Sequence, residues 1–190
     1  MEEKKDLLKQ EWFVLRGKVD YPFLFRQKEN SRGAQPYSVN IIISKDEDTQ
    51  LDLIEQKQAE AVAIGAEKYG WGESPGADFR TVERDGDRER KTSSGTSKGT
   101  IYEGSIYIKA SSKYAPAAIV DAKKQPVTDP KEIKSGDECA VVVSFYPYDA
   151  AEERPAGIGC NLVAIQKIAD GKNEAVHPRF NMDDYFNIEG

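Results

Sequence analysis

Alternating apolar and polar residues predict that most of this chain forms β-strands. Apolar residues recur at every second position from Phe13 to Tyr21, and residues 37–43 form a second run rich in β-branched side chains. Further strand patterns cover residues 100–109, 117–127 with a turn inside it, 139–146 and 157–168. Residues 72–99 and 147–155 are rich in loop-forming residues, and only a weak strand is expected within the first of these two stretches.

One segment, residues 49–69, has the periodicity of a helix instead. Apolar residues from Leu51 to Val62 recur at spacings of three and four, while acidic residues occupy the other faces. Asp48 or Thr49 is the expected N-cap, and Gly70 is expected to end the helix. Residues 1–11 are charged and predict a frayed end or a short helix.

About five long strands and one helix, joined by mostly short connections, predict a mainly β fold. A small Greek-key barrel or a sandwich fits this set of elements, and an OB-like barrel is one such fold. A length of 190 residues favours one domain with appendages. We expect a folded domain over residues 1–172 and a loose, acidic C-terminal tail over residues 173–190.

Apolar runs in this sequence are too short for a membrane span. The longest extend over about four residues, against the roughly 20 that a spanning helix requires. The N-terminus mixes both charge signs and shows no secretory signal, so the expected location is the cytoplasm. The only two cysteines, Cys139 and Cys160, are expected to be reduced and buried in strands.

Residues for catalysis or metal binding are scarce. The single histidine, His177, lies in the tail, where it cannot be held against a nucleophile. Cys139, Cys160 and His177 lack the paired spacing of a zinc site. No glycine-rich segment has the order of a phosphate-binding loop. We therefore expect neither an enzyme nor a bound metal or cofactor.

The net charge of −6 is unevenly distributed along the chain. Residues 16–45 carry six basic and two acidic side chains, and residues 84–124 carry nine and five. Residues 46–60 have a net charge of −5 and residues 181–190 one of −3, which leaves +2 on the other 165 residues. The predicted strands are thus locally basic, although the whole chain is acidic.

Many of the eighteen aromatic residues lie beside these basic positions. Single-stranded nucleic acid is bound by a basic groove along the backbone and by aromatic rings on which bases stack. Half or more of the aromatics are nevertheless expected in the core or in cross-strand pairs. The stacking candidates are Tyr37, Tyr114, Tyr146 and Tyr148, and the candidates for phosphate contacts are Lys18, Arg26, Lys28, Arg32, Lys109 and Lys113.

Several segments together resemble a family of bacteriophage-encoded single-stranded DNA-binding proteins that includes the helix-destabilising protein of T-odd phages. They are residues 110–116 (ASSKYAP), 125–127 (QPV), 143–148 (VSFYPY) and 157–167 (GIGCNLVAIQK). The upstream segments 21–22 (YP) and 36–39 (PYSV) fit as well, so the resemblance covers roughly residues 13–168 and an acidic tail.

This resemblance implies an OB fold that coats and protects single-stranded DNA, without sequence specificity, in phage replication, recombination and repair in the host cytoplasm. It implies DNA-binding roles for Arg32 and Tyr148, and a homodimer. It also implies that Asp183, Asp184, Tyr185 and Phe186 form a tail that recruits a polymerase, helicase or recombinase and competes with DNA. Here four residues follow Phe186, unlike a tail that ends in an aromatic residue.

Two alternatives remain open at this stage. The chain could be a phage structural or adaptor protein that has its aromatic residues in the core. A metal-dependent nuclease using Asp85, Asp87 or Asp183 is less favoured, because no pattern in the sequence supports it.

Overall fold

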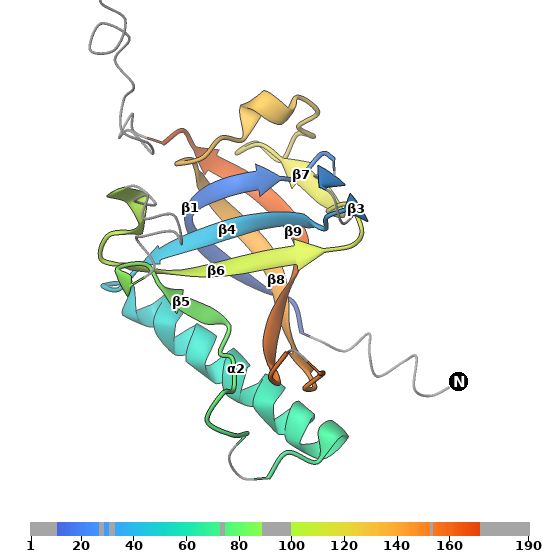
Figure 1. The fold of residues 1–190 in the computed structure, drawn as a ribbon. Helices are drawn as coiled ribbons and strands as arrows, with labels where there is room; N and C mark the ends of the chain where they lie inside the picture. Colours follow the sequence, from blue (N-terminus) through green and yellow to red (C-terminus); the bar gives the residue numbers. More distant parts are fainter. Residues whose placement is uncertain are drawn as a thin grey trace, which may run out of the picture.

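The computed structural model describes residues 11–26, 29–30, 33–72, 75–88, 100–152 and 154–171. Strands dominate these residues, with one long helix and two short 3-10 turns, η2 and η3 (Figure 1). In chain order the elements are β1 (Phe13–Phe23), β2 (Glu29–Asn30), β3 (Gly33–Ala34), β4 (Tyr37–Ser44), α2 (Asp48–Tyr69), β5 (Glu83–Asp85), η2 (Thr100–Tyr102), β6 (Ser105–Ser112), β7 (Ala118–Val120), η3 (Pro130–Glu132), β8 (Glu138–Tyr148) and β9 (Gly157–Ala169).

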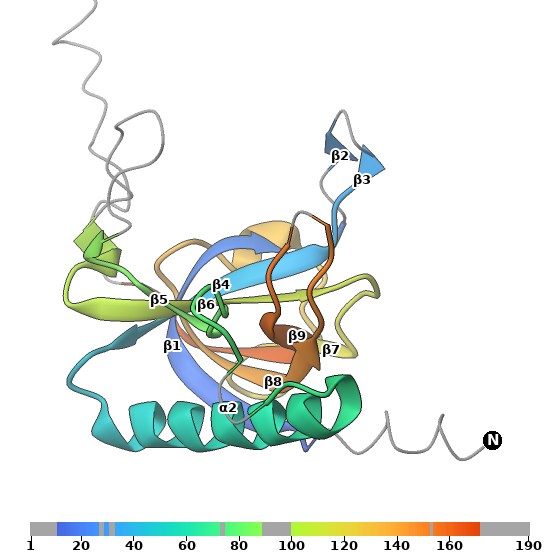
Figure 2. The ribbon, with the colours of Figure 1, turned by 60° about the horizontal axis from the view of Figure 1, so that its bottom comes forward.

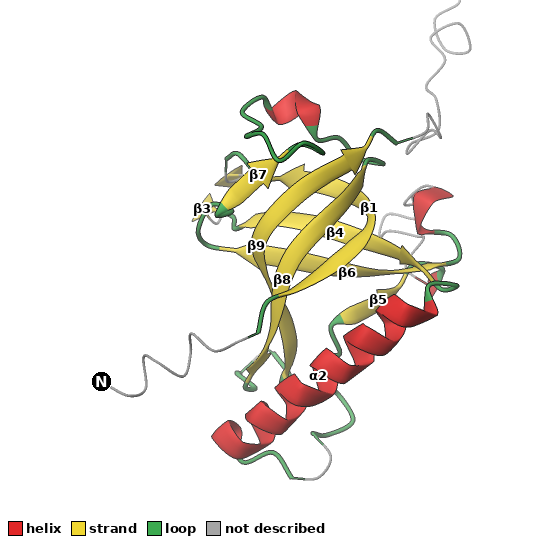
Figure 3. Ribbon diagram, turned by 180° about the vertical axis from the view of Figure 1, so that it is seen from behind, coloured by secondary structure: helices red, strands yellow, loops and turns green. Residues whose placement is uncertain are grey.

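Five of the strands close into a barrel in the order β1–β4–β6–β9–β8, with β8 pairing back onto β1. All of these pairings are antiparallel except β6 with β9, which is parallel and closes the barrel. The curvature of the sheet is clear from behind (Figure 3). This order is that of a five-stranded Greek-key OB fold, so the expected fold class is confirmed.

Alternate residues of these strands fill the barrel. Leu15, Ile41, Ile108 and Val141 are each completely buried in one apolar cluster. The core becomes aromatic next to residues 57–64 of α2, where the Phe13 and Phe145 rings meet edge to face at 4.8 Å between centroids. The period of two in the sequence therefore identifies the inward-facing side of each long strand.

Helix α2 lies across one end of the barrel (Figures 1 and 2), and β7 and η3 lie at the opposite end in Figure 1. It buries Ile54, Ala61 and Gly65, as the spacing of three and four predicts. Gly70 ends the helix in the left-handed conformation, with φ of 69°. The expected N-cap is wrong by one residue or more, because Glu47 occupies that position and makes no side-chain capping bond.

Two expected strands differ in detail. Residues 100–102 form η2 instead of the start of β6, because Gly104 turns the chain with φ of 63°. The expected hairpin at 117–127 has its turn at Asp121–Gln125, but β7 pairs mainly with β9, in parallel. Within the described part of the chain, no helix is long and apolar enough to cross a membrane.

Candidate nucleic-acid interface

Polar and aromatic side chains form a continuous strip on the outer face of the barrel. On β6, Lys109 and Ser111 alternate with the buried Ala110, and Ser111 lies opposite Asn161 of β9. Their neighbours Ala110 and Cys160 face the core, so these polar residues face outward. The strip continues along β9 onto β8. We call it the outer strip, and it comprises Lys109, Ser111, Asn161, Tyr146 and Tyr148.

The two tyrosines lie directly over glycines of the neighbouring strand. Tyr146 pairs with Gly159, and Tyr148 pairs with Gly157. A Cβ on Gly159 would overlap Cζ of Tyr146, and one on Gly157 would lie 2.5 Å from Oη of Tyr148. The ring centroids are 6.5 Å apart. Burial raises the pKa of the Tyr146 hydroxyl, so this group is neutral at physiological pH.

Two arginines flank this tyrosine pair. The guanidinium of Arg154, in the β8–β9 turn, lies over the Tyr148 ring at 4.5 Å from its centroid. The backbone of Arg80 is bonded to β9, since its N–H donates to the Ala156 carbonyl and its carbonyl accepts from Ile158. Both arginines line a cavity of about 590 Å³ between residues 78–80 and the β8–β9 turn.

Further positive charge lies along β5 and β6. Arg84 pairs with Tyr107 in the β5–β6 register and is exposed, on the same outward side as Lys109. Neither Arg84 nor Lys109 forms an ion pair with any other residue in the described part of the chain. Their charges are therefore available to a ligand on the outer face.

The structure brings together only part of the residue set expected from the sequence. Lys109, Tyr146 and Tyr148 belong to the outer strip. Three further expected residues are exposed on the loops that follow β1 and β6. They are Arg26, Lys113 and Tyr114. Those outside the described residues are Lys28, Arg32, Asp183, Asp184, Tyr185 and Phe186.

Two expected contact residues lie apart from the strip. Tyr37 is half-buried and packs against the core cluster at one end of β4. Lys18 and Arg16 line a separate cavity together with three acidic residues, Glu47, Glu103 and Glu138. Such an acidic environment is unfavourable for a second anion, so Lys18 has weaker support as a phosphate contact than Lys109.

Arg80 and Arg154 are absent from the expected set. No local pattern marks Arg80, because it lies in a long polar segment that only the fold brings beside β9. The sequence does contain a signal for the placement of Tyr146 and Tyr148. Glycines at 157 and 159 match the spacing of Tyr146 and Tyr148, which is what two rings lying across a neighbouring strand require.

A buried polar cluster limits the strip at its other side. The Tyr102 hydroxyl donates to Asp20 Oδ2 at 2.8 Å and accepts from Asn40 Nδ2 at 3.0 Å. Its ring packs edge to face on Tyr107 at 5.1 Å. Burial strongly raises the pKa of Tyr102, so the hydroxyl keeps its proton and remains a donor. Segment η2 thereby covers one part of the outer face.

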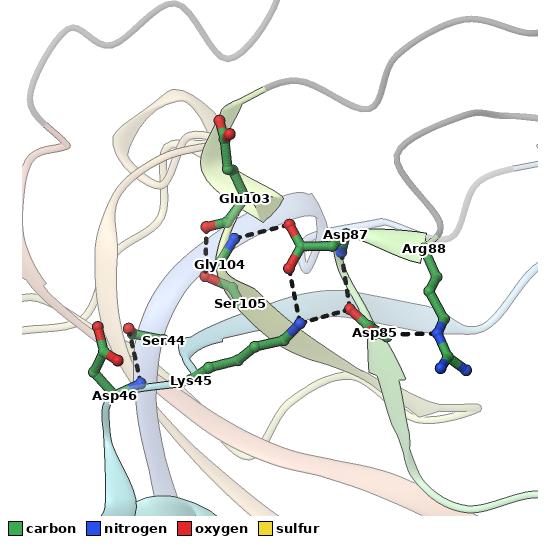
Figure 4. A network of polar contacts seen from close by, with 9 residues as sticks. All are labelled: Ser44, Lys45, Asp46, Asp85, Asp87, Arg88, Glu103, Gly104 and Ser105. Carbon is green, nitrogen blue, oxygen red and sulfur yellow. Dashed lines mark hydrogen bonds and ion pairs between the residues drawn. The ribbon is translucent and has the colours of Figure 1, made fainter.

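The chain segments beside η2 are joined by an ionic network (Figure 4). Lys45 Nζ contacts Asp85 Oδ1 at 2.8 Å and Asp87 Oδ2 at 2.7 Å, and Asp87 also accepts from the Gly104 amide. Asp85 and Asp87 are thus paired with a lysine. Among the described residues no group of three or more His, Cys, Asp or Glu side chains is placed to hold a metal.

The two cysteines are part of the core. Both are nearly inaccessible, and burial raises the pKa of Cys139 to about 12 and that of Cys160 further still. A protonated, enclosed thiol is a poor nucleophile and a poor metal ligand. The expectation of buried strand thiols is confirmed.

Solved structures of phage single-stranded DNA-binding proteins share this fold. The protein of bacteriophage Enc34 in complex with ssDNA superposes with a TM-score of 0.67 at 18% identity, over 86% of this chain and 89% of that chain. A second structure of the same phage protein gives a TM-score of 0.64 at 19% identity, over 93% of this chain and 90% of that chain. Protein gp2.5 of bacteriophage T7, a single-stranded DNA-binding protein, gives 0.59 at 17% identity, over 95% and 97%.

At these identities the structural matches establish the fold alone. A comparison with curated protein sequences found no match. A family model, described as the ssDNA-binding protein of Enterobacter phage Enc34, matches residues 14–188, which is most of the chain. The chain therefore belongs to the Enc34 phage ssDNA-binding protein family.

Proposed function

We propose that this protein binds single-stranded DNA along the outer strip, without sequence specificity and without a catalytic step. The observation that carries the proposal is the Tyr146–Tyr148 pair, held on glycines of β9 and flanked by arginines. Membership of a family of ssDNA-binding proteins supports it.

The chemistry of the strip suits an unpaired strand. Tyrosine faces accept any base by stacking, worth roughly 1–3 kcal/mol per base, and this interaction requires bases that are not paired in a duplex. Lys109, Arg84 and Arg80 supply positive charge along the path of the strand. Each phosphate they neutralise makes the affinity more sensitive to salt. OB folds commonly bind oligonucleotides on the face of their second and third strands, here β4 and β6, and on the loops that join strands 1–2 and 4–5. The outer strip shares β6 and the end next to the β8–β9 turn with that region.

The family also supports a wider role. On this proposal the folded domain, residues 1–172, coats and protects single strands during phage replication, recombination and repair in the host cytoplasm. The tail, residues 173–190, recruits a polymerase, helicase or recombinase through Asp183, Asp184, Tyr185 and Phe186. The protein acts as a homodimer in this scheme.

Binding of a fluorescently labelled oligo-dT, followed by anisotropy at several salt concentrations, tests the central proposal. We expect tight binding at low salt, affinity that falls steeply as salt rises, and much weaker binding to a duplex of equal length. Equal affinity for the duplex, or no binding at low salt, would refute the proposal and favour an adaptor role.

A matched pair of variants locates the site. Lys109→Ala removes a charge from the outer strip, whereas Lys131→Ala removes an equal charge from η3 at the other end of β9. We expect only Lys109→Ala to weaken binding. It should also reduce the slope of log affinity against log salt concentration by about 0.7, the value for one phosphate contact on a single strand. Equal losses from both variants would place the site elsewhere.

A further inference from the structure

One face of the Tyr148 ring is occupied in the free protein. The Arg154 guanidinium lies 4.5 Å from the ring centroid, and its Nη2 donates to the Asp149 carbonyl at 3.2 Å. The hydroxyl end of the ring lies against Gly157. A base could stack on that face of Tyr148 only after Arg154 had moved.

The ring and the Asp149 carbonyl hold Arg154 at the edge of the cavity that it shares with Arg80. The backbone of Arg80 is bonded on both sides to residues 156 and 158, so its Cα has a fixed position beside Gly157. Arg80 and Arg154 therefore both line one cavity at the end of the outer strip. Guanidinium groups match the geometry of phosphate oxygens, to which they donate two hydrogen bonds at once.

Two carboxylates also line this cavity. Asp78 and Glu152 are both exposed, and neither forms an ion pair with Arg80 or Arg154. The carboxylates therefore do not occupy the guanidinium donors, of which, among the described residues, only Nη2 of Arg154 is used, by the Asp149 carbonyl. The acids lower the affinity of the cavity for anions that are not held by the rest of a strand.

We propose that Arg80 and Arg154 form a phosphate subsite of the bound strand, and that Tyr148 is a positioning residue that orients Arg154 instead of stacking on a base. This inference rests on the proposed function and specifies how one end of that site works. It assigns base stacking at this end of the strip to Tyr146, over whose ring no cation of the described residues lies.

The salt dependence of oligo-dT binding distinguishes a positioning role of Tyr148 from a stacking role. A lost phosphate contact makes the plot of log affinity against log salt concentration less steep, whereas a lost stacking contact leaves its slope unchanged. We expect Arg154→Ala and Tyr148→Leu each to reduce the slope by about 0.7, which corresponds to a roughly eightfold loss at 50 mM salt. Arg80→Ala should behave alike. Tyr148→Phe keeps the ring and should bind like the wild type.

The double variant Tyr148→Leu/Arg154→Ala completes the cycle. It should bind no more weakly than Arg154→Ala, because Tyr148 acts through Arg154. If the double variant loses affinity by the product of the two single losses, or if Tyr148→Leu binds weakly with an unchanged slope, the proposal is overturned.

Circular dichroism checks the fold of Tyr148→Leu. If that variant is unfolded, the substitutions Arg154→Ala and Arg80→Ala at exposed residues still test the subsite. Absence of wild-type binding would instead refute the proposed function.

Discussion

Single glycines decide where the two tyrosine rings can lie. Gly157 and Gly159 provide bare backbone beneath Tyr148 and Tyr146, and any side chain there would occupy the volume of a ring. Ring placement at the strip thus depends on β9 as much as on the tyrosines themselves. This arrangement also explains why two glycines stand in the first three residues of β9.

Gly159→Ala should displace the Tyr146 ring. Because the new Cβ overlaps Cζ of that ring, we expect several-fold weaker oligo-dT binding and a loss of stability of about 1–3 kcal/mol. Gly72→Ala is the matched control, since nothing lies within 4 Å of a Cβ at that position. Anisotropy titration and urea unfolding measure the two effects. Wild-type binding by Gly159→Ala would show that ring position is unimportant.

At the scale of elements, a buried hydroxyl helps to hold the short 3-10 turn η2 on the barrel. Tyr102→Phe removes the donor to Asp20, a carboxylate with no exposed surface. We expect the variant to lose about 1–3 kcal/mol in urea unfolding, the usual cost of leaving a buried acceptor without its partner. Tyr114→Phe, at a residue with 75% exposure, should be neutral. Equal stability of both variants would contradict this account.

The Lys45 network predicts how acid affects the joined segments. The hydrogen bond from Lys45 lowers the pKa of Asp85 below its ordinary value of 3.8. The ionised carboxylate therefore stabilises the fold at pH values above 3.8, and this stabilisation is lost as the pH falls through the lowered pKa. Wild type should therefore melt at a higher temperature than Asp85→Asn at pH 7, with the gap closing below pH 3.8. Asp46→Asn, beside the network but not within it, is the control. A gap that persists in acid would exclude this linkage.

The elements themselves follow from local pattern, but their contacts across the fold do not. The alternation of Leu15 and Val19 predicts the inward face of β1, and residues 51–62 predict the buried face of α2, because both patterns reflect burial on one side. Arg80 could not be predicted as a site residue, because its position depends on pairing with Gly157, which is 77 residues away. Tyr102 was expected in a strand, and Gly104 and the polar partners on β1 and β4 place it in η2 instead.

For the whole molecule, the distribution of charge matters more than its sum. The net charge is −6, yet Arg84 and Lys109 on the outer face form no ion pair within the described residues, and residues 181–190 contribute −3. Deleting residues 181–190 should therefore tighten oligo-dT binding at low salt, with the gain disappearing as salt screens the interaction. Replacing Asp183, Asp184 and Glu189 by Asn, Asn and Gln removes the three charges and keeps the chain length, so this variant separates the effect of charge from that of length. Unchanged affinity in both would show that the tail does not compete with DNA.

The packing of Trp71 gives the protein an internal optical probe. Its indole fills the space above Gly65, contacts Phe79, and donates to Asp149 at 3.1 Å, directly beside the β8–β9 turn. The only other tryptophan, Trp12, is 68% exposed at the start of β1. In a Trp12→Phe protein, Trp71 would be the only tryptophan. Under excitation that selects tryptophan over tyrosine, its emission wavelength would report rearrangement of that turn without a label on the protein or the DNA.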